Sequence, residues 1–458
     1  MRAVSLTSLL AWGLAGCSMA PAYAPPSLAT PAAFRDTGPW TPVGSAQASA
    51  DSAWWTVFAD PVLDGLERRM DDASADLAAA VARYDQARAL SRQASSALWP
   101  QVGAAAGTSR QRNPTNGRFD ATTVSASAAY EVDLWGRLRN LAAAGRADAQ
   151  ASAADLAGAR LSLQAELADT YFRLRGADAQ IAVLSSTAEA FGQALDLTRR
   201  RQAGGAASAI DTGRAQTQLA ATQAQYEQAV ADRALLEHAI AVLVGQPASS
   251  FALPAASGLA DAPAMPVGAP STLLQRRPDI AAAERRMAAA NAHIGVARAA
   301  WFPSVTLAAT GGYQSSGGEL LTAANRVWAL GPLAAALPLI DGGARKAEVA
   351  RSQAVFDETA AGYRQTVLDA FREVEDQMVL ANRLAAAQGR QDEAVAAAGR
   401  TTALATTRYR EGAAAYLDVV TAQTAELDAR RGALDLRTRR LAASVDLIRA
   451  LGGGWAAG

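Results

Sequence analysis

Proline placement is the feature of this sequence that most constrains its fold. No proline occurs between Pro114 and Pro247, and none follows Pro338. Because proline breaks helix interiors, both stretches permit very long helices. Apolar residues recur at steps of three, four and seven in the first stretch and with similar spacing in the second, as in long helices packed as coiled coils. These residues are Leu163, Leu167, Leu174, Ile181, Leu184, Ala188, Phe191 and Leu195, then Val367, Phe371, Val374, Met378 and Leu384. A helix over about residues 136–204 would be roughly 100 Å long.

The chain also carries an internal duplication. The matched segments are Ala97–Pro100 with Ala300–Pro303, Gly136–Arg139 with Gly342–Arg345, and Gly205–Asp211 with Gly412–Asp418. They keep their order, and the offset changes only from 203 positions at the prolines to 207 at the last glycines. Such a period is far longer than that of a solenoid repeat. We therefore expect two equivalent halves, residues 59–247 and 271–452.

Each half contains segments with period-two alternation, which is typical of β-strands with one apolar face. The apolar series are Thr122, Val124, Ala126, Ala128, Tyr130, Val132 and Leu134, then Val305, Leu307, Ala309, Gly311 and Tyr313. Weaker strand patterns cover 101–109 and 326–340. The sequence thus predicts one hairpin per half, at about 101–134 and 304–340. The alternation fits either a small half-exposed sheet or membrane strands whose other face, with Ser125 and Ser127, lines a lumen.

The membrane alternative has a consequence for assembly. The strands suit the roughly 10 residues that a transmembrane β-strand needs. Four strands are too few for a barrel, since closed barrels start at about eight, and an open edge in lipid leaves backbone groups unpaired. If these strands cross a membrane, several chains must share one barrel. Trp99, Trp301 and Phe302 lie where helix meets strand, a position suited to a lipid–water interface or to a local core.

The N-terminus has the features of a secretory signal. Arg2 precedes a mostly apolar run over residues 4–14, and residues 1–16 form the expected signal peptide. The run ends Leu-Ala-Gly-Cys at Cys17, the single cysteine of the chain. This tetrapeptide resembles the bacterial lipobox, which implies cleavage before Cys17 and a covalent lipid on that residue. Ser18 stands where an inner-membrane retention signal has Asp, so outer-membrane sorting is implied.

The residues after the lipobox predict an anchor segment. Residues 17–58 are rich in proline, alanine, serine and threonine and show almost no periodicity. We expect them to form an extended, lipid-anchored segment before the first repeat, with no domain of their own.

Composition and motifs exclude several classes of protein. Lys plus Arg and Asp plus Glu both number 43, and this neutral balance argues against a nucleic-acid partner. One cysteine and two isolated histidines, His238 and His293, are too few for a disulfide framework or a thiolate or histidine metal site. The sequence lacks a nucleophile elbow, a phosphate loop and a zinc-protease motif. We predict no enzymatic activity, no metal and no cofactor other than the lipid on Cys17.

The ordered set of motifs resembles the TolC-like outer-membrane factors, specifically the lipoprotein branch of OprM and NodT type in tripartite RND efflux systems. The segments that carry the resemblance are Leu14–Cys17, Ala97–Pro100, Tyr130–Arg139, Leu274–Ile280, Ala299–Pro303 and Ala450–Trp455. They extend over nearly the whole chain.

The resemblance implies a mostly α-helical fold with a β-barrel part. In this family three chains contribute four strands each to one twelve-stranded outer-membrane barrel, and long helices continue it as a periplasmic tunnel. The implied function is a passive export duct for drugs or other small molecules, in a homotrimer that works with a periplasmic adaptor and an inner-membrane RND transporter. Two alternatives stay open: a duct for protein secretion or metal efflux, and a non-pore structural lipoprotein with a periplasmic coiled coil.

The resemblance also implies a gate at the periplasmic end, where Gly205 and Gly412 let the long helices turn back. The gate residues expected there are Leu417, Asp418, Thr421, Asp211 and Arg214. Asp418 matches the family's first carboxylate position, whereas Thr421 replaces a second aspartate, so one ring of carboxylates is expected to be lost. Asp211 and Arg214 are expected to pair one helical turn apart. The alternative is that both aspartates serve only as acids at helix N-termini.

Overall fold

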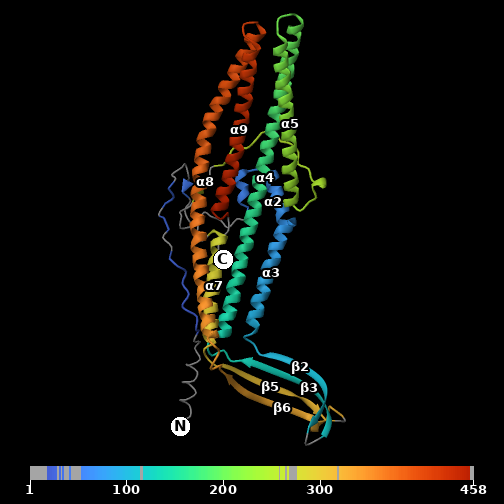
Figure 1. Cartoon of the computed structure of the whole chain (residues 1–458), viewed down its shortest axis with the longest axis vertical. Coiled ribbons are helices and arrows are strands. Elements are labelled where there is room, and N and C mark those ends of the chain that lie inside the picture. The colour runs from blue at the N-terminus through green and yellow to red at the C-terminus, as the bar shows by residue number, and fades with distance from the viewer. Residues whose placement is uncertain are drawn as a thin grey trace. The chain divides into compact units, whose positions relative to one another are not determined.

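The computed structural model describes residues 18–27, 30, 31, 33–35, 41, 42, 53–113, 117–256, 258–263, 266, 267, 276–316 and 319–453. The expected signal peptide and Cys17 lie outside these residues. The described chain is mostly helical and contains one four-stranded antiparallel sheet (Figure 1). Among the described helices, none carries an apolar run sufficient to cross a bilayer.

The two halves contain the same helices with the same lengths. The pairs are α3 (Ala75–Ser96) and α7 (Pro278–Ala299) with 22 residues each, α4 (Arg137–Ala203) and α8 (Ala344–Arg410) with 67, and α5 (Ala209–Leu243) and α9 (Tyr416–Ala450) with 35. This equality confirms the predicted repeat. The helix expected over about 136–204 corresponds to α4.

Each half contributes one hairpin to the sheet. The strands are β2 (Gln101–Asn113), β3 (Gly117–Glu131), β5 (Ser304–Ser315) and β6 (Arg326–Ala336). Their order is β2-β3-β5-β6, so the hairpins pair through β3 and β5, and β2 and β6 form the edges. A short 3-10 turn, η4 (Ala323–Asn325), precedes β6.

The alternating pattern predicted a second strand of the first hairpin that runs to Leu134, which is longer than the strand in the structure. Val132 and Leu134 lie beyond the end of β3 at Glu131. The reason is Asp133, whose carboxylate accepts hydrogen bonds from the backbone N–H groups of Leu138 at 3.2 Å and Arg139 at 2.9 Å. These bonds satisfy donors that a helix N-terminus leaves free, so the chain is already entering α4.

The chain divides into two compact units. The first comprises residues 1–28, 82–155 and 279–366, and therefore contains the sheet, α7 and the adjoining ends of α3, α4 and α8. In this unit α4 and α7 pack through small residues, namely Ala144, Ala147, Ala289 and Ala292. Small side chains at the contact allow two helices to approach closely.

The second unit comprises residues 29–81, 156–278 and 367–458. Its largest core joins η1 (Trp54–Phe58), α2 (Pro61–Ala73), α4, α5 and α9. Most positions that the helical spacing marked as apolar are buried in this unit, namely Leu167, Leu174, Leu184, Phe191, Leu195, Val367, Val374, Met378 and Leu384. The others, Leu163, Ile181, Ala188 and Phe371, are half-buried. Short segments complete it: η2 (Ala248–Ser250) and the two-residue parallel pair β1 (Thr41–Pro42) with β4 (Pro266–Val267).

The end of the expected anchor segment belongs to this core. Residues 17–58 were predicted to be extended, but Trp54–Phe58 form a 3-10 helix that buries Trp55 and Phe58. Phe58 lies against Phe172 of α4, with ring centroids 4.8 Å apart. Burial of these large rings outweighs the low helix signal of the surrounding sequence.

Candidate functional site

The register of the sheet sorts its residues onto two different faces. Opposed residues share a face, and successive residues alternate between faces. One side, here the apolar face, carries Val102, Ala104, Ala106, Val124, Ala126, Ala128, Tyr130, Val305, Leu307, Ala309, Tyr313, Trp328, Leu330 and Leu333. The opposite side, the small-residue face, carries Gly103, Ala105, Gly107, Thr123, Ser125, Ser127, Ala129, Thr306, Ala308, Thr310, Gly312 and Val327. The four strands thus present one continuous apolar surface and one lined mainly by small and hydroxyl side chains.

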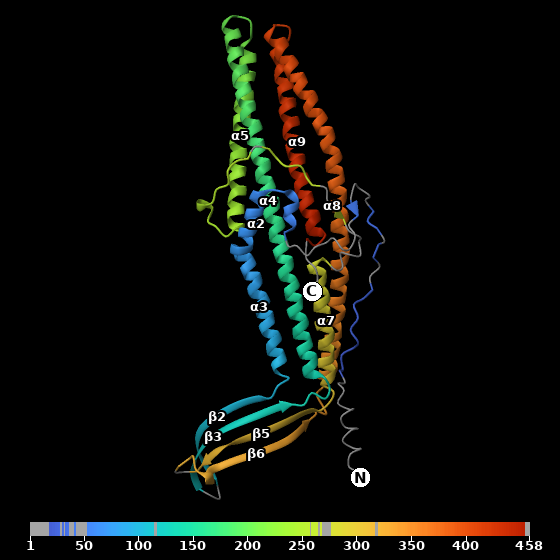
Figure 2. The same cartoon turned by 180° about the vertical axis from the view of Figure 1, so that it is seen from behind.

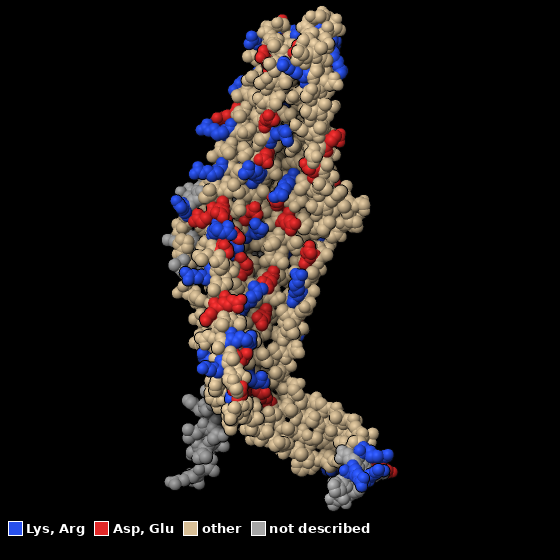
Figure 3. All heavy atoms as spheres, in the orientation of Figure 1, with Lys and Arg blue, Asp and Glu red and all other residues tan. Residues whose placement is uncertain are grey.

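A band without charged residues crosses the sheet. It covers 101–109, 121–130, 304–315 and 327–336, and Figure 3 shows this part of the surface free of acidic and basic side chains. Its length matches the roughly 9–11 residues of a transmembrane β-strand. In the first hairpin an ion pair lies at each end of this band. Arg137 pairs with Glu131 at the helix end, at 2.8 and 2.6 Å, and Arg110 pairs with Asp120 at the far end, at 2.7 and 3.0 Å.

Aromatic residues occupy the junction between helices and strands. The Trp135 indole N–H donates to the Pro303 carbonyl at 2.8 Å, and its ring stacks on Phe302 with centroids 4.6 Å apart. The Arg345 guanidinium lies 5.0 Å from the Trp301 ring centroid. Trp99, by contrast, is 72 % exposed. Trp301 and Phe302 make these local contacts while 49 % and 37 % exposed, so all three aromatic side chains are accessible at this junction.

The second half repeats the helix cap of the first. The Asp341 carboxylate accepts from the Gly343 N–H at 3.0 Å and from the Arg345 guanidinium at 2.6 Å. The bond from Arg345 holds the pKa of Asp341 below its ordinary value. Asp341 thus begins α8 as Asp133 begins α4, so both long helices start from a fixed carboxylate at the edge of the sheet.

Residues 18–27, here the N-terminal strap, run beside α4 and α7. The Ser18 hydroxyl donates to the Asn140 side-chain oxygen at 2.9 Å, and Asn291 donates to the Pro21 carbonyl at 2.9 Å. The Tyr23 hydroxyl donates to the Glu284 carbonyl at 3.1 Å and to its carboxylate. Burial and this carboxylate raise the pKa of Tyr23. Ser18, at the start of the strap, therefore lies beside the first turn of α4, next to the sheet.

The predicted gate residues gather where α4 turns into α5 and α8 into α9 (Figure 2). Gly205 and Gly412 have φ values of 74° and 80°, in the left-handed region that favours glycine. The next N–H in each turn, from Ala206 and Ala413, donates to the Arg201 and Arg408 carbonyls at 2.8 Å. Both helices thus end in the same glycine-dependent cap.

Asp211 and Asp418 act at the starts of the returning helices. The Asp211 carboxylate accepts from the Ser208 hydroxyl at 2.8 Å and from its N–H at 3.2 Å, and Asp418 accepts from the Ala415 N–H at 3.3 Å. Ser208 engages the Asp211 carboxylate in a capping box, and the structure gives no ion pair between Asp211 and Arg214 among the described residues. The capping role given as the alternative is therefore present at both positions.

Leu417 and Thr421 occupy the first turns of α9. Leu417 is 48 % exposed, while its neighbour Tyr416 is 3 % exposed. The Thr421 hydroxyl donates to the Leu417 carbonyl at 2.9 Å. Tyr416, which the sequence did not single out, packs with Leu195, Ala215, Tyr409 and Val419 in a small core that joins the two turns. The pKa of Tyr416 is raised to about 12, mainly by burial and secondly by the nearby Tyr409 and Asp211 side chains.

Arg201 ties the two turns together. Its guanidinium donates to the Tyr409 carbonyl at 2.6 Å and to the Arg410 carbonyl at 2.7 Å. It also lies 4.4 Å from the centroid of the Tyr409 ring. The sequence held no signal for this contact, because arginines in the last turn of a helix are common. We call Arg201, Tyr409 and Tyr416 the tip clasp.

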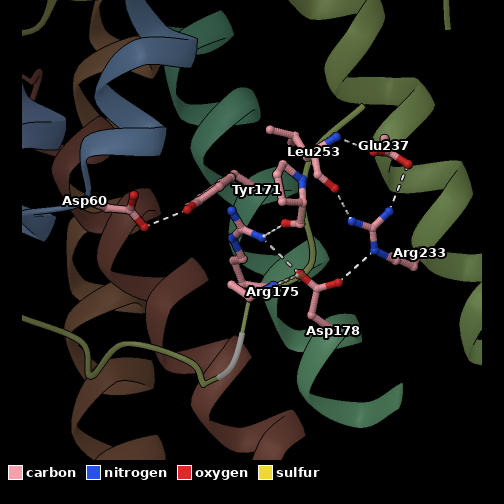
Figure 4. Close-up of polar contacts among 9 residues, drawn as sticks. Asp60, Tyr171, Arg175, Asp178, Arg233, Glu237 and Leu253 are labelled. Atoms are coloured by element: carbon pink, nitrogen blue, oxygen red, sulfur yellow. Dashed lines mark hydrogen bonds and ion pairs between the residues drawn. The ribbon is translucent and has the colours of Figure 1, made fainter. Parts of the chain in front are cut away.

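A buried ionic network holds the segment that follows α5 (Figure 4). Asp178 of α4 pairs with Arg175 at 3.0 Å and with Arg233 of α5 at 2.7 Å. Arg233 also pairs with Glu237 at 2.8 Å and donates to the Leu253 carbonyl at 2.6 Å. Arg175 donates to the Pro254 carbonyl at 2.8 Å, and the Ala256 N–H donates to Asp178 at 3.1 Å. The link between the repeats is therefore bonded to both helices of the first hairpin.

These features define a class of protein. A duplicated chain of paired long helices, joined to a charge-free sheet with one apolar face, is an outer-membrane channel with a long helical periplasmic part. The chain belongs to the outer membrane efflux protein family, whose family model matches residues 69–246 and 269–453.

Individual relatives agree with this assignment over nearly their whole length. The chain is 33 % identical to the antibiotic efflux pump outer membrane protein ArpC of Pseudomonas putida, over 98 % of this chain and 96 % of that protein. It is 34 % identical to the pyoverdine export outer membrane protein OpmQ of Pseudomonas aeruginosa, over 96 % and 95 %. The solved structure of the outer-membrane channel OprN superposes with a TM-score of 0.86 at 30 % identity, covering 94 % of this chain and 99 % of that one.

The family membership settles the general function. The chain is an outer-membrane channel of an efflux pump and not an enzyme. Within the described residues, no three His, Cys, Asp or Glu side chains are grouped in a way that could hold a metal ion.

Proposed function

We propose that three copies of this chain close one barrel and form an export duct for drug-type small molecules. The observation that carries the proposal is the four-stranded sheet with an apolar, charge-free face and two edges, β2 and β6, that have no strand partner among the described residues. Strand edges in lipid must be paired. Strand direction alternates across the sheet, so β6 of one copy beside β2 of the next continues the antiparallel order. Three copies supply twelve strands.

We infer that the duct works with a periplasmic adaptor and an inner-membrane RND transporter. ArpC and OpmQ are named for the export of antibiotics and of pyoverdine, which are small organic molecules. A lumen lined by the small-residue face, with Ser125 and Ser127, binds such molecules weakly and leaves their choice to the transporter.

We also propose that Cys17 carries a covalent lipid. The support comes from the strap, because Ser18 is bonded to Asn140 in the first turn of α4. That turn follows the end of the charge-free band at Glu131. A lipid on the preceding residue would therefore start beside the bilayer surface, and its acyl chains would enter the inner leaflet.

The gate is proposed at the helix turns. Leu417, Asp418, Thr421, Asp211 and Arg214 stand in the first turns of α5 and α9, next to the tip clasp. We propose that the clasp holds the two helical hairpins of one chain together in the closed state. The carboxylates of Asp418 from three copies would then surround the axis, where like charges repel.

Conductance tests the proposed function. The full-length protein, extracted from outer membranes, is expected to migrate as a trimer and to give single-channel currents in planar bilayers. A strain that lacks its own outer-membrane factor should regain antibiotic resistance when it carries this chain with its transporter and adaptor. A stable trimer that gives no current, even after substitutions in the tip clasp, would contradict the duct and favour a structural lipoprotein.

A further inference from the structure

Three arginines stand together at the end of the sheet opposite its helix connections. Arg110 and Arg112 belong to β2 and Arg118 to β3. The register places Arg110 opposite Asp120 and Arg112 opposite Arg118. Because positions two apart on a strand share a face, all four side chains lie on the same face. Figure 3 shows the basic side chains gathered at this end of the otherwise uncharged sheet.

The charges of this cluster are only partly balanced. Arg110 and Asp120 neutralise each other through two hydrogen bonds of 2.7 and 3.0 Å. Arg112 and Arg118 are exposed, and neither forms an ion pair with a carboxylate in the described part of the chain. Like charges directly opposite each other on paired strands are destabilising. An anion bound between the two guanidinium groups would remove that repulsion.

The face on which the arginines stand identifies the environment of this anion. Continuing the register, Thr108 lies opposite Thr122 and Ala106 opposite Val124, so the arginines share the apolar face. An arginine pair that attracts exported anions would be expected on the small-residue face. This pair instead borders the charge-free band on the side proposed to meet lipid, at the headgroup level remote from the periplasmic helices.

We propose that Arg112 and Arg118 bind the phosphate groups of the phosphorylated glycolipid that forms the outer leaflet of the outer membrane. Guanidinium groups bind phosphate through paired, charge-assisted hydrogen bonds, and basic clusters beside membrane segments recognise anionic headgroups. The proposal rests on the proposed function only for the orientation of the sheet, with its apolar face toward lipid. The contact would fix the depth of the first hairpin in the membrane.

Binding of lipid A, the phosphorylated acyl-glucosamine core of this glycolipid, tests the proposal. The full-length protein is delipidated in detergent and titrated with bis-phosphorylated lipid A, with the same lipid after removal of its phosphates, and with inorganic phosphate. The variants are Arg112→Gln/Arg118→Gln, Arg112→Lys/Arg118→Lys and, as a charge-matched control, Arg83→Gln/Arg92→Gln at two exposed positions of α3. Trimer content and single-channel conductance are measured for every protein.

We expect the parent and the α3 control to bind the phosphorylated lipid about tenfold or more tightly than the dephosphorylated one. The glutamine variant should lose this difference while it keeps trimers and current, and the lysine variant should keep part of it. Equal binding of both lipids by the parent, unchanged discrimination in the glutamine variant, or equally tight binding of inorganic phosphate would overturn the proposal. Conductance separates the two proposals, because a parent without current refutes the duct whatever lipid it binds.

Discussion

Arg201 at the end of α4 donates a 2.6 Å hydrogen bond to the backbone carbonyl of Tyr409 at the end of α8, 208 positions later in the chain. A second bond of 2.7 Å reaches the Arg410 carbonyl. The last carbonyls of a helix lack partners within that helix and carry its negative dipole end. The Arg201 guanidinium of the first repeat thus supplies hydrogen-bond donors to the last carbonyls of α8 in the second repeat. The two helical hairpins are therefore fastened at the point where the gate is proposed.

Removal of this cation should loosen the closed state. Charge-assisted hydrogen bonds contribute about 1.5–3 kcal/mol each, and less where solvent reaches them. For Arg201→Ala we expect larger single-channel conductance and faster uptake of a large antibiotic by cells, with trimer levels unchanged. Arg200→Ala is the matched control, since the Arg200 side chain, among the described residues, donates only to the Asp196 carbonyl of its own helix, at 3.3 Å. Equal conductance in both variants would show that the clasp does not hold the gate.

Asp418 offers a way to separate gating from capping. Its carboxylate caps α9 through the Ala415 N–H, and loss of a cap costs about 1 kcal/mol. Asp418→Asn keeps an acceptor but removes the charge, whereas Asp418→Ala removes both. If the charge contributes to the gate, both variants should change conductance, as should Arg214→Ala. A change confined to Asp418→Ala, together with a lower unfolding temperature, would leave Asp418 with a capping role alone.

The hairpin faces should differ in their tolerance of charge. Ala126 lies on the apolar face and Ser125 on the small-residue face of the same strand. An arginine on the lipid side at mid-membrane costs about 2–4 kcal/mol, and far less in an aqueous lumen. We therefore expect Ala126→Arg to reduce assembled outer-membrane trimers strongly and Ser125→Arg to leave them nearly intact. Immunoblots of unheated outer membranes measure this, and equal trimer yields would refute the assigned faces.

The mature N-terminus should be a lipid-modified Cys17. Intact mass spectrometry of the protein from outer membranes is expected to show a chain that begins at Cys17 and carries acyl groups. Cys17→Ser behind a different signal peptide should give an unacylated protein that can still insert, because the apolar face buries far more surface than acyl chains, which contribute about 0.8 kcal/mol per CH₂. A free thiol at Cys17, or cleavage elsewhere, would contradict the lipid anchor.

Glu67 should make stability depend on pH. Its side chain is fully buried in the core of α2, and neither carboxyl oxygen has a hydrogen-bond partner among the described residues. Burial, and secondly the Asp71 carboxylate, raise the pKa of Glu67 from 4.5 to about 9. The folded chain thus keeps a proton that the unfolded chain releases. The stability from this neutral carboxyl is complete below pH 4.5 and is lost as pH rises toward 9.

Glu67→Gln tests this dependence. The variant side chain is neutral in both the folded and the unfolded state. We therefore expect its free energy of unfolding near pH 8 to exceed that of the parent by a few kcal/mol, and to depend less on pH. Unfolding temperatures by circular dichroism between pH 5 and 9 measure the effect. Asp72→Asn, at an exposed position of the same helix, should leave the parent profile unchanged. A parent whose stability rises through this range would contradict the raised pKa.

Much of the architecture could be predicted from the sequence because its causes are local or periodic. Proline-free stretches with helical spacing predicted α4 and α8, and period-two alternation predicted both hairpins. The duplicated motifs predicted equal helices in the two halves. The glycines at 205 and 412 mark turns because their backbone adopts a positive φ that other residues rarely take. Each of these signals lies within a few neighbouring residues or repeats along the chain.

Only the tertiary structure decided which distant side chains meet. The Arg201 contact with Tyr409 joins two helix ends whose sequences contain many other arginines, and Ser208 instead of Arg214 engages Asp211. Packing drew Trp54–Phe58 into a core although its sequence context predicts an extended segment. The strand register set Arg112 against Arg118 on the apolar face. Such contacts depend on how long helices and strands align over tens of residues, and a shift of one residue in a strand would exchange its two faces.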